Sequence, residues 1–246
     1  MATASKRRYE ARLSRDDADV AAAQRLRALA FGSDRGDGRD CDLFDDICTH
    51  ILVEDTRSGA LVCCFRMLPL RGGSEIGRSY AAQFYELSAL ERFEGPMVEM
   101  GRFCIHPDHH DGDILRAAWG AMTRYVDDNG VEMLFGCSSF SGTDAGSYLD
   151  AFAMLKDRHL AHRRWLPRVK SPLVYRFAQI LRLRRPDQKQ AMLRMPPLLR
   201  TYLMMGGWVS DHAVVDQKMN TLHVFTGVEI KAIPPMRKRL LRAAAQ

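Results

Sequence analysis

The sequence predicts an α/β fold, in which a mixed sheet is flanked by helices. Strand-like and helical segments alternate along most of the 246 residues, and this order is expected of a sheet covered by helices. Two strand-like segments are joined by a short turn near residue 57, which predicts an antiparallel hairpin. The segment 97–105 has the apolar character of a buried strand and leads through a polar turn into an apolar helix. Substrates of α/β proteins bind at such edges.

The elements of the first half follow from alternation, helical spacing and turn residues. Ser14 is the expected N-cap of the first helix. The pattern predicts, in chain order, a strand over 9–13, a helix over 16–31, a charged Gly-rich loop over 32–42, and strands over 47–53 and 61–67 joined by the turn 56–59.

The second half continues the alternation after a long connection over 72–95. The pattern predicts a short helix near 85–92, a strand over 97–105, a helix over 113–129, a strand over 133–137, a helix from about 145 to 160 with cap residues at 141–144, a helix over 187–205, and a closing strand over 222–230. We expect one domain over 1–246, with a basic helical segment at about 158–205.

The composition is that of an ordinary globular chain, with 46% apolar and 27% charged residues. The polar N-terminus has no apolar core of signal length, and no apolar run approaches the length of a membrane span. The 6 cysteines include no Cys-x-x-Cys pair, which favours buried reduced thiols over a zinc site. We therefore expect a cytoplasmic protein.

Positive charge is concentrated in one segment. Residues 158–200 carry twelve Lys or Arg against one acid, Asp187, a net charge of +11, while the whole chain has only +6. Such asymmetry predicts an acidic partner, and nucleic acid, an anionic membrane or an acidic carrier protein all fit. The alternative is a solvated face without a partner.

Two charged residues, Glu99 and Arg102, lie within the predicted strand 97–105. Side chains alternate between the faces of a strand, so residues three apart point to opposite faces. Burial of either charge costs several kcal/mol unless the charge is paired or used. The two residues are therefore candidate catalytic groups, and the alternative is a structural ion pair.

Other charged residues also lie where a core face is expected. Arg27 stands in Arg-x-x-x-Phe, Asp42 and Asp45 form Asp-x-x-Asp before the second strand, and Arg66 lies near the end of the third. Each pattern alone is weak because a lone charged pair is usually a surface bridge. Their order and placement resemble the acyl-homoserine-lactone synthases over about the first 140 residues. The Trp that this family has after the Arg-x-x-x-Phe element is absent.

A closer resemblance covers most of the chain. Segments 99–107, 135–144 and 196–203 resemble the ornithine-acyl carrier protein N-acyltransferases, a hemolysin-like branch of the GCN5-related acyltransferase fold. The Gly136–Asp144 segment is the most specific match, and His109 or His110 departs from the Arg of relatives. The resemblance implies a mixed sheet of that fold and transfer of a 3-hydroxy fatty acyl group to the α-amine of L-ornithine, the first step of ornithine lipid synthesis.

Amide formation assigns roles to these residues. An α-ammonium must lose a proton before it attacks a thioester, and Glu99 can accept it directly or through water. Arg102 could hold the substrate carboxylate or orient Glu99. Asp42 and Asp45 could bind the distal ammonium of the substrate or merely cap a loop, and Arg27 and Arg66 could bind the substrate carboxylate or pair with those aspartates. The remaining predicted substrate contacts are the backbone N–H groups of Phe103, Cys104 and Ile105 as oxyanion donors, and Ser139 and Phe140 of the matching segment.

The donor is expected to be acyl carrier protein. Enzymes of this fold that use coenzyme A bind its pyrophosphate at a Gly-rich turn, whereas the turn 108–113 has one Gly and three acids. The basic segment, through Arg182, Arg184 and Arg185, would bind the acidic carrier. We expect no metal, because the spacing of the His residues and Asp111 in 106–111 matches no ligand rule, and no cofactor beyond the carrier's phosphopantetheine.

Several alternatives stay open. The acceptor could be glutamine or another amino acid, and the enzyme could be an acyl-homoserine-lactone synthase. A non-catalytic basic protein that binds membrane or nucleic acid is the alternative from a different class. For the enzyme, we expect a cytoplasmic location with peripheral binding to the inner face of the cytoplasmic membrane.

Overall fold

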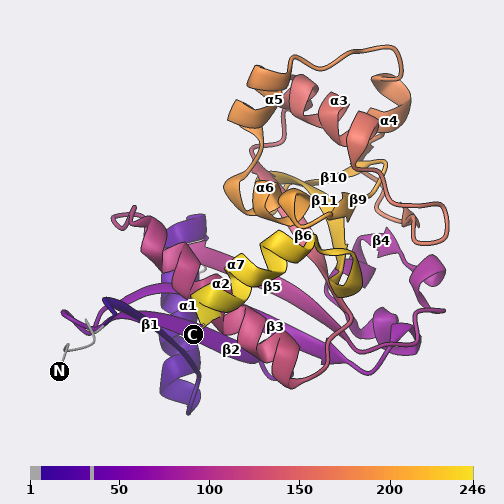
Figure 1. Ribbon diagram of the computed structural model, residues 1–246. Helices are drawn as coiled ribbons and strands as arrows, with labels where there is room; N and C mark the ends of the chain where they lie inside the picture. Colours follow the sequence, from indigo (N-terminus) through magenta and orange to yellow (C-terminus); the bar gives the residue numbers. More distant parts are fainter. Residues whose placement is uncertain (1–6, 34–35, 246) are drawn as a thin grey trace. The chain divides into compact units, whose positions relative to one another are not determined.

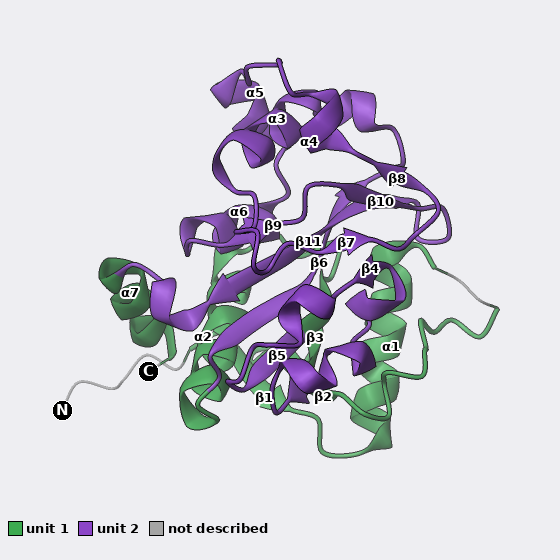
Figure 2. Ribbon diagram, turned by 90° about the vertical axis from the view of Figure 1, so that its right-hand side faces the viewer, with its two compact units in different colours: residues 1–68, 100–130, 235–246 green, residues 69–99, 131–234 purple. Residues whose placement is uncertain are grey.

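The computed structural model describes residues 7–33 and 36–245, and these fall into two compact units (Figure 2). Unit 1 comprises 1–68, 100–130 and 235–246, and unit 2 comprises 69–99 and 131–234. Strand β5 (Met97–Ile105) begins in unit 2 and continues into unit 1. Strands with helices against them make up both units, so the predicted α/β class is confirmed. The prediction of a single domain stays a prediction.

Unit 1 contains the antiparallel strands of the first half. The strand order is β1 (Tyr9–Leu13), β2 (Thr49–Asp55), β3 (Leu61–Leu70) and β5, with helices α1 (Asp17–Phe31), α2 (Gly112–Asp128) and α7 (Pro235–Ala245). Helices α2 and α7 lie side by side (Figure 1). Gly120 permits this approach because a Cβ there would lie 2.4 Å from the carbonyl oxygen of Ala244. Arg242 and Asp127 join the two helices by an ion pair of 2.9 Å.

Helix ends in unit 1 follow local sequence, with one correction. Asp16, rather than the predicted Ser14, is the N-cap of α1, and its side chain accepts from the Asp19 N–H at 2.9 Å. The helix ends at Gly32, whose φ of 63° lies in the left-handed region that glycine adopts without strain. Asp111 caps α2 in the same way as Asp16 caps α1.

Unit 2 contains a mixed sheet built around β6 (Met133–Ser141). Strand β6 pairs in parallel with β5 from Met97↔Met133 to Glu99↔Phe135, and it pairs antiparallel with β11 (Thr221–Glu229). Strand β11 also pairs with β9 (Trp208–Val209) and with β10 (Ala213–Asp216), which continues to β8 (Val174–Tyr175). A separate small sheet pairs β4 (Tyr85–Glu86) with β7 (Arg168–Val169).

The helices of unit 2 are short. They are α3 (Leu149–Arg158), α4 (Phe177–Ile180), α5 (Gln188–Arg194) and α6 (Pro197–Met204), with 3₁₀ turns η1 (Gly73–Arg78), η2 (Ala81–Gln83), η3 (Ser88–Leu90), η4 (Ala145–Tyr148) and η5 (Ile230–Ala232). Helices α3, α4 and α5 pack on an apolar cluster that includes Phe140, Phe152 and Phe177.

Three predictions for the second half of the chain are wrong in detail. The helix expected near 85–92 is β4 followed by η3. The helix expected over 187–205 is divided at Met195, which is extended before Pro196, because a residue before proline disfavours the helical region. The basic segment 158–205, expected to be helical, contains the strands β7 and β8 as well as short helices. The C-terminal segment 235–245, for which no element was predicted, forms α7.

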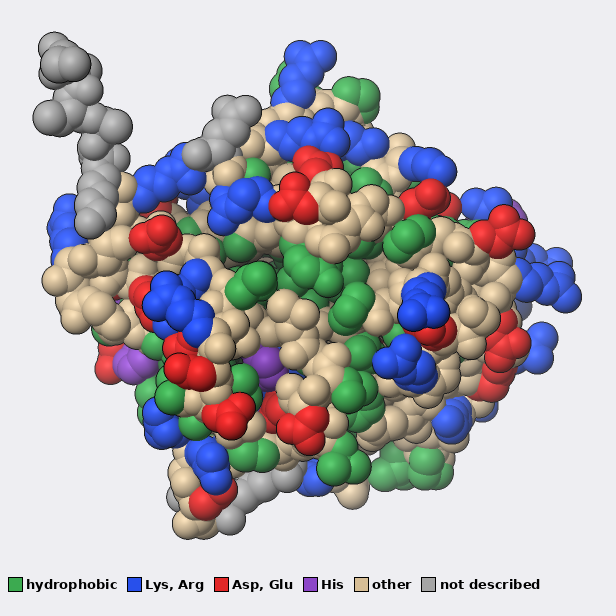
Figure 3. Space-filling view, turned by 90° about the horizontal axis from the view of Figure 1, so that it is seen from below, with side chains coloured by type: hydrophobic (Ala, Val, Ile, Leu, Met, Phe, Trp, Pro, Cys, Tyr) green, Lys and Arg blue, Asp and Glu red, His purple; other side chains and the backbone are tan. Residues whose placement is uncertain are grey.

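Apolar side chains occur both in the helices and on the surface of the protein. Across the described part of the chain, no helix combines the length and the apolar character that crossing a bilayer requires. On the face shown in Figure 3, acidic and basic side chains are interspersed around hydrophobic ones.

Candidate active site

The predicted charged residues of unit 1 form one buried ion-pair network together with Asp40, which was not predicted. Its members are three arginines and three aspartates: Arg27, Arg66, Arg102, Asp40, Asp42 and Asp45. Helix α1 contributes Arg27, β3 contributes Arg66, β5 contributes Arg102, and the loop before β2 contributes the aspartates. The charges balance within the network, as buried charges require.

Asp45 lies at the centre of this network. Arg27 donates to both its carboxylate oxygens at 2.8 and 2.7 Å, Arg66 donates at 2.6 Å, and the Gln24 amide donates at 3.0 Å. Asp45 is only 7% exposed. Its oxygens are thus already occupied by protein donors, which fits the structural pairing that the sequence left open.

Asp42 is the more accessible aspartate. Arg66 binds both its oxygens at 2.5 and 2.8 Å, and Arg102 donates at 3.0 Å. Its side chain is 19% exposed, against 5% for that of Asp45. A substrate cation could therefore approach Asp42 more readily than Asp45.

The network fixes the ionisation of its carboxylates. Burial alone would raise the pKa of Asp45, but hydrogen bonds from Arg27 and the charges of Arg27 and Arg66 hold that pKa far below its usual range. The pKa of Asp42 is also lowered. Burial alone would raise it, but the hydrogen bond from Arg66 and the charges of Arg66 and Arg102 outweigh the effect of burial. Neither carboxylate is suited to accept a proton at neutral pH.

Arg102 has an unusual backbone conformation. Its φ of 53° places a non-glycine residue in the left-handed region within a strand. This conformation costs about 1–3 kcal/mol and persists where surrounding contacts fix it. Its contacts with Asp40 at 2.9 Å and Asp42 at 3.0 Å do so here. A left-handed residue interrupts the alternation of side chains along a strand. The expectation that Glu99 and Arg102 point to opposite faces assumed unbroken alternation, so it does not hold at Arg102.

Glu99 lies in unit 2, in the part of β5 that pairs with β6. Each of its carboxylate oxygens accepts a backbone N–H at 2.7 Å, one from Tyr80 and one from Ala81. Hydrogen bonds to a carboxylate are stronger than neutral ones. Glu99 is 5% exposed, and its catalytic role stays a prediction.

The other predicted substrate contacts lie in different environments. The Phe103 ring stacks on Phe65 at 5.5 Å, and the Cys104 sulfur lies 3.5 Å from that of Cys64 in the cluster under α1. Ile105 is half-buried. The oxyanion role of these three N–H groups stays a prediction.

Ser139 and Phe140 are neighbours on β6 and therefore face opposite sides of the sheet. Ser139 is exposed. Phe140 is 1% exposed and packs with Phe152 in the core under α3, so it has no surface to offer a substrate. Of the two, Ser139 remains the candidate contact.

The predicted partner residues Arg182, Arg184 and Arg185 are exposed in the loop between α4 and α5. Arg184 also pairs with Asp150 at 3.0 Å. The Lys156 ammonium donates to the carbonyls of Leu181, Arg182 and Arg184 at 2.8, 3.3 and 2.9 Å. The loop is therefore ordered by its own contacts, and Arg184 has a structural role beside any partner role.

Sequence reasoning missed two groups of residues. Asp40, which is 0% exposed, stood in an apparently solvated Gly-rich loop, and only its alternation with Asp42 could have indicated it. Tyr85 and His223 meet in the core of unit 2 although 138 residues separate them. The signal for His223 was a polar residue inside the apolar closing strand.

The turn 106–111 is held by local contacts. Asp111 caps α2, and it also lies 3.4 Å from Arg8. The N–H of Asp113, in the first turn of α2, thus already has an acidic partner. In residues 7–33 and 36–245, no three His, Cys, Asp or Glu side chains are placed to hold a metal ion.

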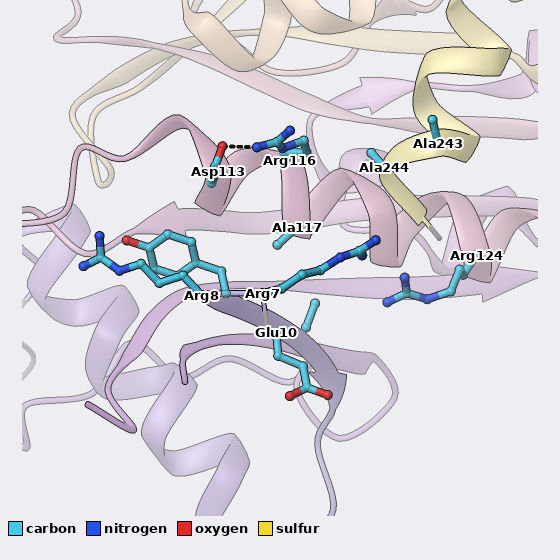
Figure 4. A pocket seen from close by; sticks show the side chains of 11 residues that line it. Arg7, Arg8, Glu10, Asp113, Arg116, Ala117, Arg124, Ala243 and Ala244 are labelled. Atoms are coloured by element: carbon cyan, nitrogen blue, oxygen red, sulfur yellow. Dashed lines mark hydrogen bonds and ion pairs between the residues drawn. The ribbon is translucent and has the colours of Figure 1, made fainter. Parts of the chain in front are cut away.

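Unit 1 also contains a pocket of about 690 Å³ between the start of β1, α2 and the end of α7. Figure 4 shows Arg7 and Arg124 extending toward each other across it, while Arg116 pairs with Asp113. None of the predicted site residues lines this pocket.

Comparison with known proteins identifies the family. Residues 26–120 match the acetyltransferase (GNAT) domain. The L-ornithine N(alpha)-acyltransferase of Rhodobacter capsulatus is 31% identical over 239 residues, which cover 92% of this chain and 91% of that protein. The protein of the same name from Brucella abortus is 28% identical over 240 residues, covering 91% of this chain and 85% of its own length. A solved CoA-dependent acyl-homoserine lactone synthase is similar with a TM-score of 0.49 at 15% identity, covering 93% of this chain and 82% of that one.

The domain match and the two L-ornithine N(alpha)-acyltransferases confirm the resemblance on which the expected fold and enzyme class rested. The chain is an acyltransferase and belongs to the L-ornithine N(alpha)-acyltransferase family.

Proposed function

We propose that this enzyme transfers a 3-hydroxy fatty acyl group from acyl carrier protein to the α-amine of L-ornithine, as the first step of ornithine lipid synthesis. The observation that carries the acceptor is the similarity to proteins named L-ornithine N(alpha)-acyltransferase over about nine-tenths of the chain. The identification of the acyl group and of the carrier rests on the resemblance described for the sequence. Because the product is a lipid, we also propose a cytoplasmic enzyme that binds the inner membrane surface peripherally.

Glu99 acts as the general base in this proposal. It accepts a proton from the α-ammonium directly or through water, and the free amine attacks the thioester carbonyl. The C–N bond forms first and gives a tetrahedral oxyanion. When this intermediate collapses, the C–S bond breaks, and the proton that the nitrogen loses on becoming an amide goes to the phosphopantetheine sulfur, which leaves as a thiol. Backbone N–H groups of Phe103 to Ile105 stabilise the oxyanion.

Arg102 and Asp42 bind the amino acid in this proposal. Arg102 holds the α-carboxylate, and Asp42 attracts the distal ammonium of ornithine. Asp42 is preferred to Asp45 because its side chain is more exposed, at 19% against 5%. Arg27, Arg66 and Asp45 hold these two residues in place through the ion-pair network.

Ornithine specificity is tested with purified enzyme, acyl carrier protein loaded with a 3-hydroxyacyl chain, and ornithine, lysine or glutamine as acceptor. We expect the highest kcat/KM with ornithine and acylation at the α-nitrogen by mass spectrometry. Equal or better use of glutamine would refute the ornithine assignment and leave the acyltransferase class standing. Lipid mass spectrometry of cells with and without the protein supplies the matching result in vivo.

Acyl-CoA is expected to be a much poorer donor than acyl carrier protein. The turn that would bind a pyrophosphate is acidic, and Asp111 already caps α2 there, so the anionic nucleotide is repelled. Initial rates at equal concentrations of the two donors with the same acyl chain check this. Acyl-pantetheine, which has neither nucleotide nor carrier, is the control for the pantetheine group that both donors share. Equal rates with the CoA and carrier donors would contradict the assignment.

Carrier binding is expected to depend on the exposed loop arginines and on salt. Charge reversal of Arg182 and Arg185 to Glu should raise the KM for the acyl carrier protein and leave kcat unchanged, because rim charges act mainly on association. Charge reversal of Arg184 should also lower stability, because Arg184 pairs with Asp150. Lys218→Glu is the matched control for an exposed cation outside the basic segment. A carrier KM that does not respond to Arg182 and Arg185 would remove this surface as the docking site.

A further inference from the structure

A buried histidine in the closing strand of unit 2 has one ring nitrogen without a partner. His223 of β11 is 3% exposed. The Tyr85 hydroxyl donates to the His223 carbonyl at 2.7 Å and lies 3.1 Å from its Nδ1. A phenol has one proton, and the carbonyl can only accept, so Nδ1 must carry the proton that makes the second hydrogen bond. Nε2 is therefore an acceptor with a free lone pair.

No residue in the described part of the chain donates to His223 Nε2, although this atom is buried. An unsatisfied buried acceptor costs about 1–3 kcal/mol, and such a group in an enzyme requires an explanation. Burial lowers the pKa of His223 to about 4, so the ring is neutral at neutral pH and the lone pair stays available. A ligand that brings a hydrogen-bond donor would satisfy it.

His223 shares a face of the unit 2 sheet with Glu99. Glu99 pairs with Phe135 and His223 pairs with Ser139. Phe135 and Ser139 are four residues apart on β6, and their side chains point to the same face. One segment contacts both groups: the Tyr80 and Ala81 N–H groups bind Glu99, and Tyr85 binds His223. Ser139 is exposed, so this face is open to solvent beside His223.

The surroundings of His223 are aromatic. Phe84 meets its ring edge-on at 5.0 Å, and Tyr85 lies at 5.6 Å and also packs on Phe225 at 5.7 Å. Such apolar surroundings suit an acyl chain. A neutral hydroxyl can donate one hydrogen bond and keep the rest of the chain in apolar contact.

We propose that His223 Nε2 accepts a hydrogen bond from the 3-hydroxyl group of the donor acyl chain and selects it over an unsubstituted chain. This inference rests on the proposed function and names a specificity residue for it. Tyr85 is a positioning residue, because its hydroxyl fixes the tautomer that leaves Nε2 as an acceptor. Sites built to bind a hydroxyl discriminate strongly against analogues that lack it.

The test compares kcat/KM for a 3-hydroxyacyl and an unsubstituted acyl chain of equal length on acyl carrier protein. Wild type should prefer the 3-hydroxyacyl donor by at least roughly tenfold. His223→Phe should remove most of that preference while changing kcat/KM for the unsubstituted donor little. In this variant the Tyr85 hydroxyl can still donate to the backbone carbonyl of residue 223, so the variant should fold. His223→Gln, whose amide oxygen can replace Nε2, should restore part of the preference.

Two further variants separate specificity from structure. Tyr85→Phe should weaken the preference, because Nδ1 loses the acceptor that fixes its proton. His212→Phe is the control, since His212 is also buried, at 1% exposed, and also packs on Tyr85, at 5.3 Å. An unchanged preference in His223→Phe, an equal loss with both donors, or an equal effect of His212→Phe would overturn the proposal. Absence of ornithine acylation with either donor would instead overturn the proposed function.

Discussion

Replacement of Glu99 by Gln is expected to lower kcat roughly 10²–10⁴-fold, the usual loss on removal of a general base. The expected cause is chemical, because an amide cannot accept the proton of the α-ammonium. Steady-state rates with ornithine and a 3-hydroxyacyl carrier measure it. Glu229→Gln, which changes another strand glutamate of unit 2, is the matched control and should retain activity.

Glu99 also holds a segment of backbone, so the same variant has a structural effect. A Gln side chain can accept from only one of the two N–H groups, and its own NH₂ then opposes the other. We expect a loss of about 1–3 kcal/mol in stability. Thermal unfolding must therefore accompany the kinetics, and rates are compared below the transition of both proteins.

Tyr80→Pro separates the two roles. Tyr80 has a φ of −60° and follows an extended Ser79, so proline fits the backbone and removes only one N–H from the Glu99 carboxylate. Tyr80→Ala controls for the lost side chain. If Glu99 is the base, Tyr80→Pro keeps most of the turnover of Tyr80→Ala. A loss as large as that of Glu99→Gln would show that Glu99 acts only by holding the segment.

Asp45→Asn is expected to destabilise the protein by about 3–5 kcal/mol, because one partner of a buried ion pair is removed while the others stay charged. Arg27 and Arg66 would both lose a carboxylate, at 2.7 and 2.6 Å in the intact network. For a chain of this size, each kcal/mol shifts Tm by about 2–4 °C. Asp46→Asn, an exposed neighbour with the same charge change, should leave Tm within about a degree or two.

The stability difference caused by Asp45→Asn should depend on pH. The pKa of Asp45 is lower in the folded chain than its ordinary value of 3.8. Asp45 therefore stabilises the fold fully above that ordinary value and loses this contribution as pH falls toward the folded pKa. Denaturant unfolding between pH 6 and pH 2 should show the two proteins converging at the acid end. A difference that stays constant over that range would contradict the charge argument.

The ion-pair network also determines how Asp45 can affect the binding of ornithine. Both oxygens of Asp45 bind arginines, so its substitution should act on ornithine KM through the position of Asp42 and Arg102 rather than through a lost contact. Asp42→Asn is the variant expected to raise the KM for ornithine more than that for glutamine. We place the direct contact with the distal ammonium at Asp42 because its side chain is more exposed than that of Asp45, at 19% against 5%.

The sequence by itself determined the α/β class, the family and most strands, because those depend on local patterns. The strand over 97–105 and the helix after it agree with β5 and α2 within a residue. Glu99, Arg102 and the Arg27–Asp45–Arg66 set were singled out because charges inside apolar strands need partners. The division of the helix at Pro196 was also within reach, since proline restricts the residue before it.

Only the tertiary structure decided which charges meet and what remains unpaired. Arg102 and Asp42 are 60 residues apart in sequence, and no periodic pattern couples such positions. The left-handed backbone at Arg102 cancels the strand alternation from which faces were assigned. The acceptor at His223 exists because Tyr85, 138 residues away, fixes one proton. Hydrogen bonds at such separation form through packing, and packing is set by the whole fold.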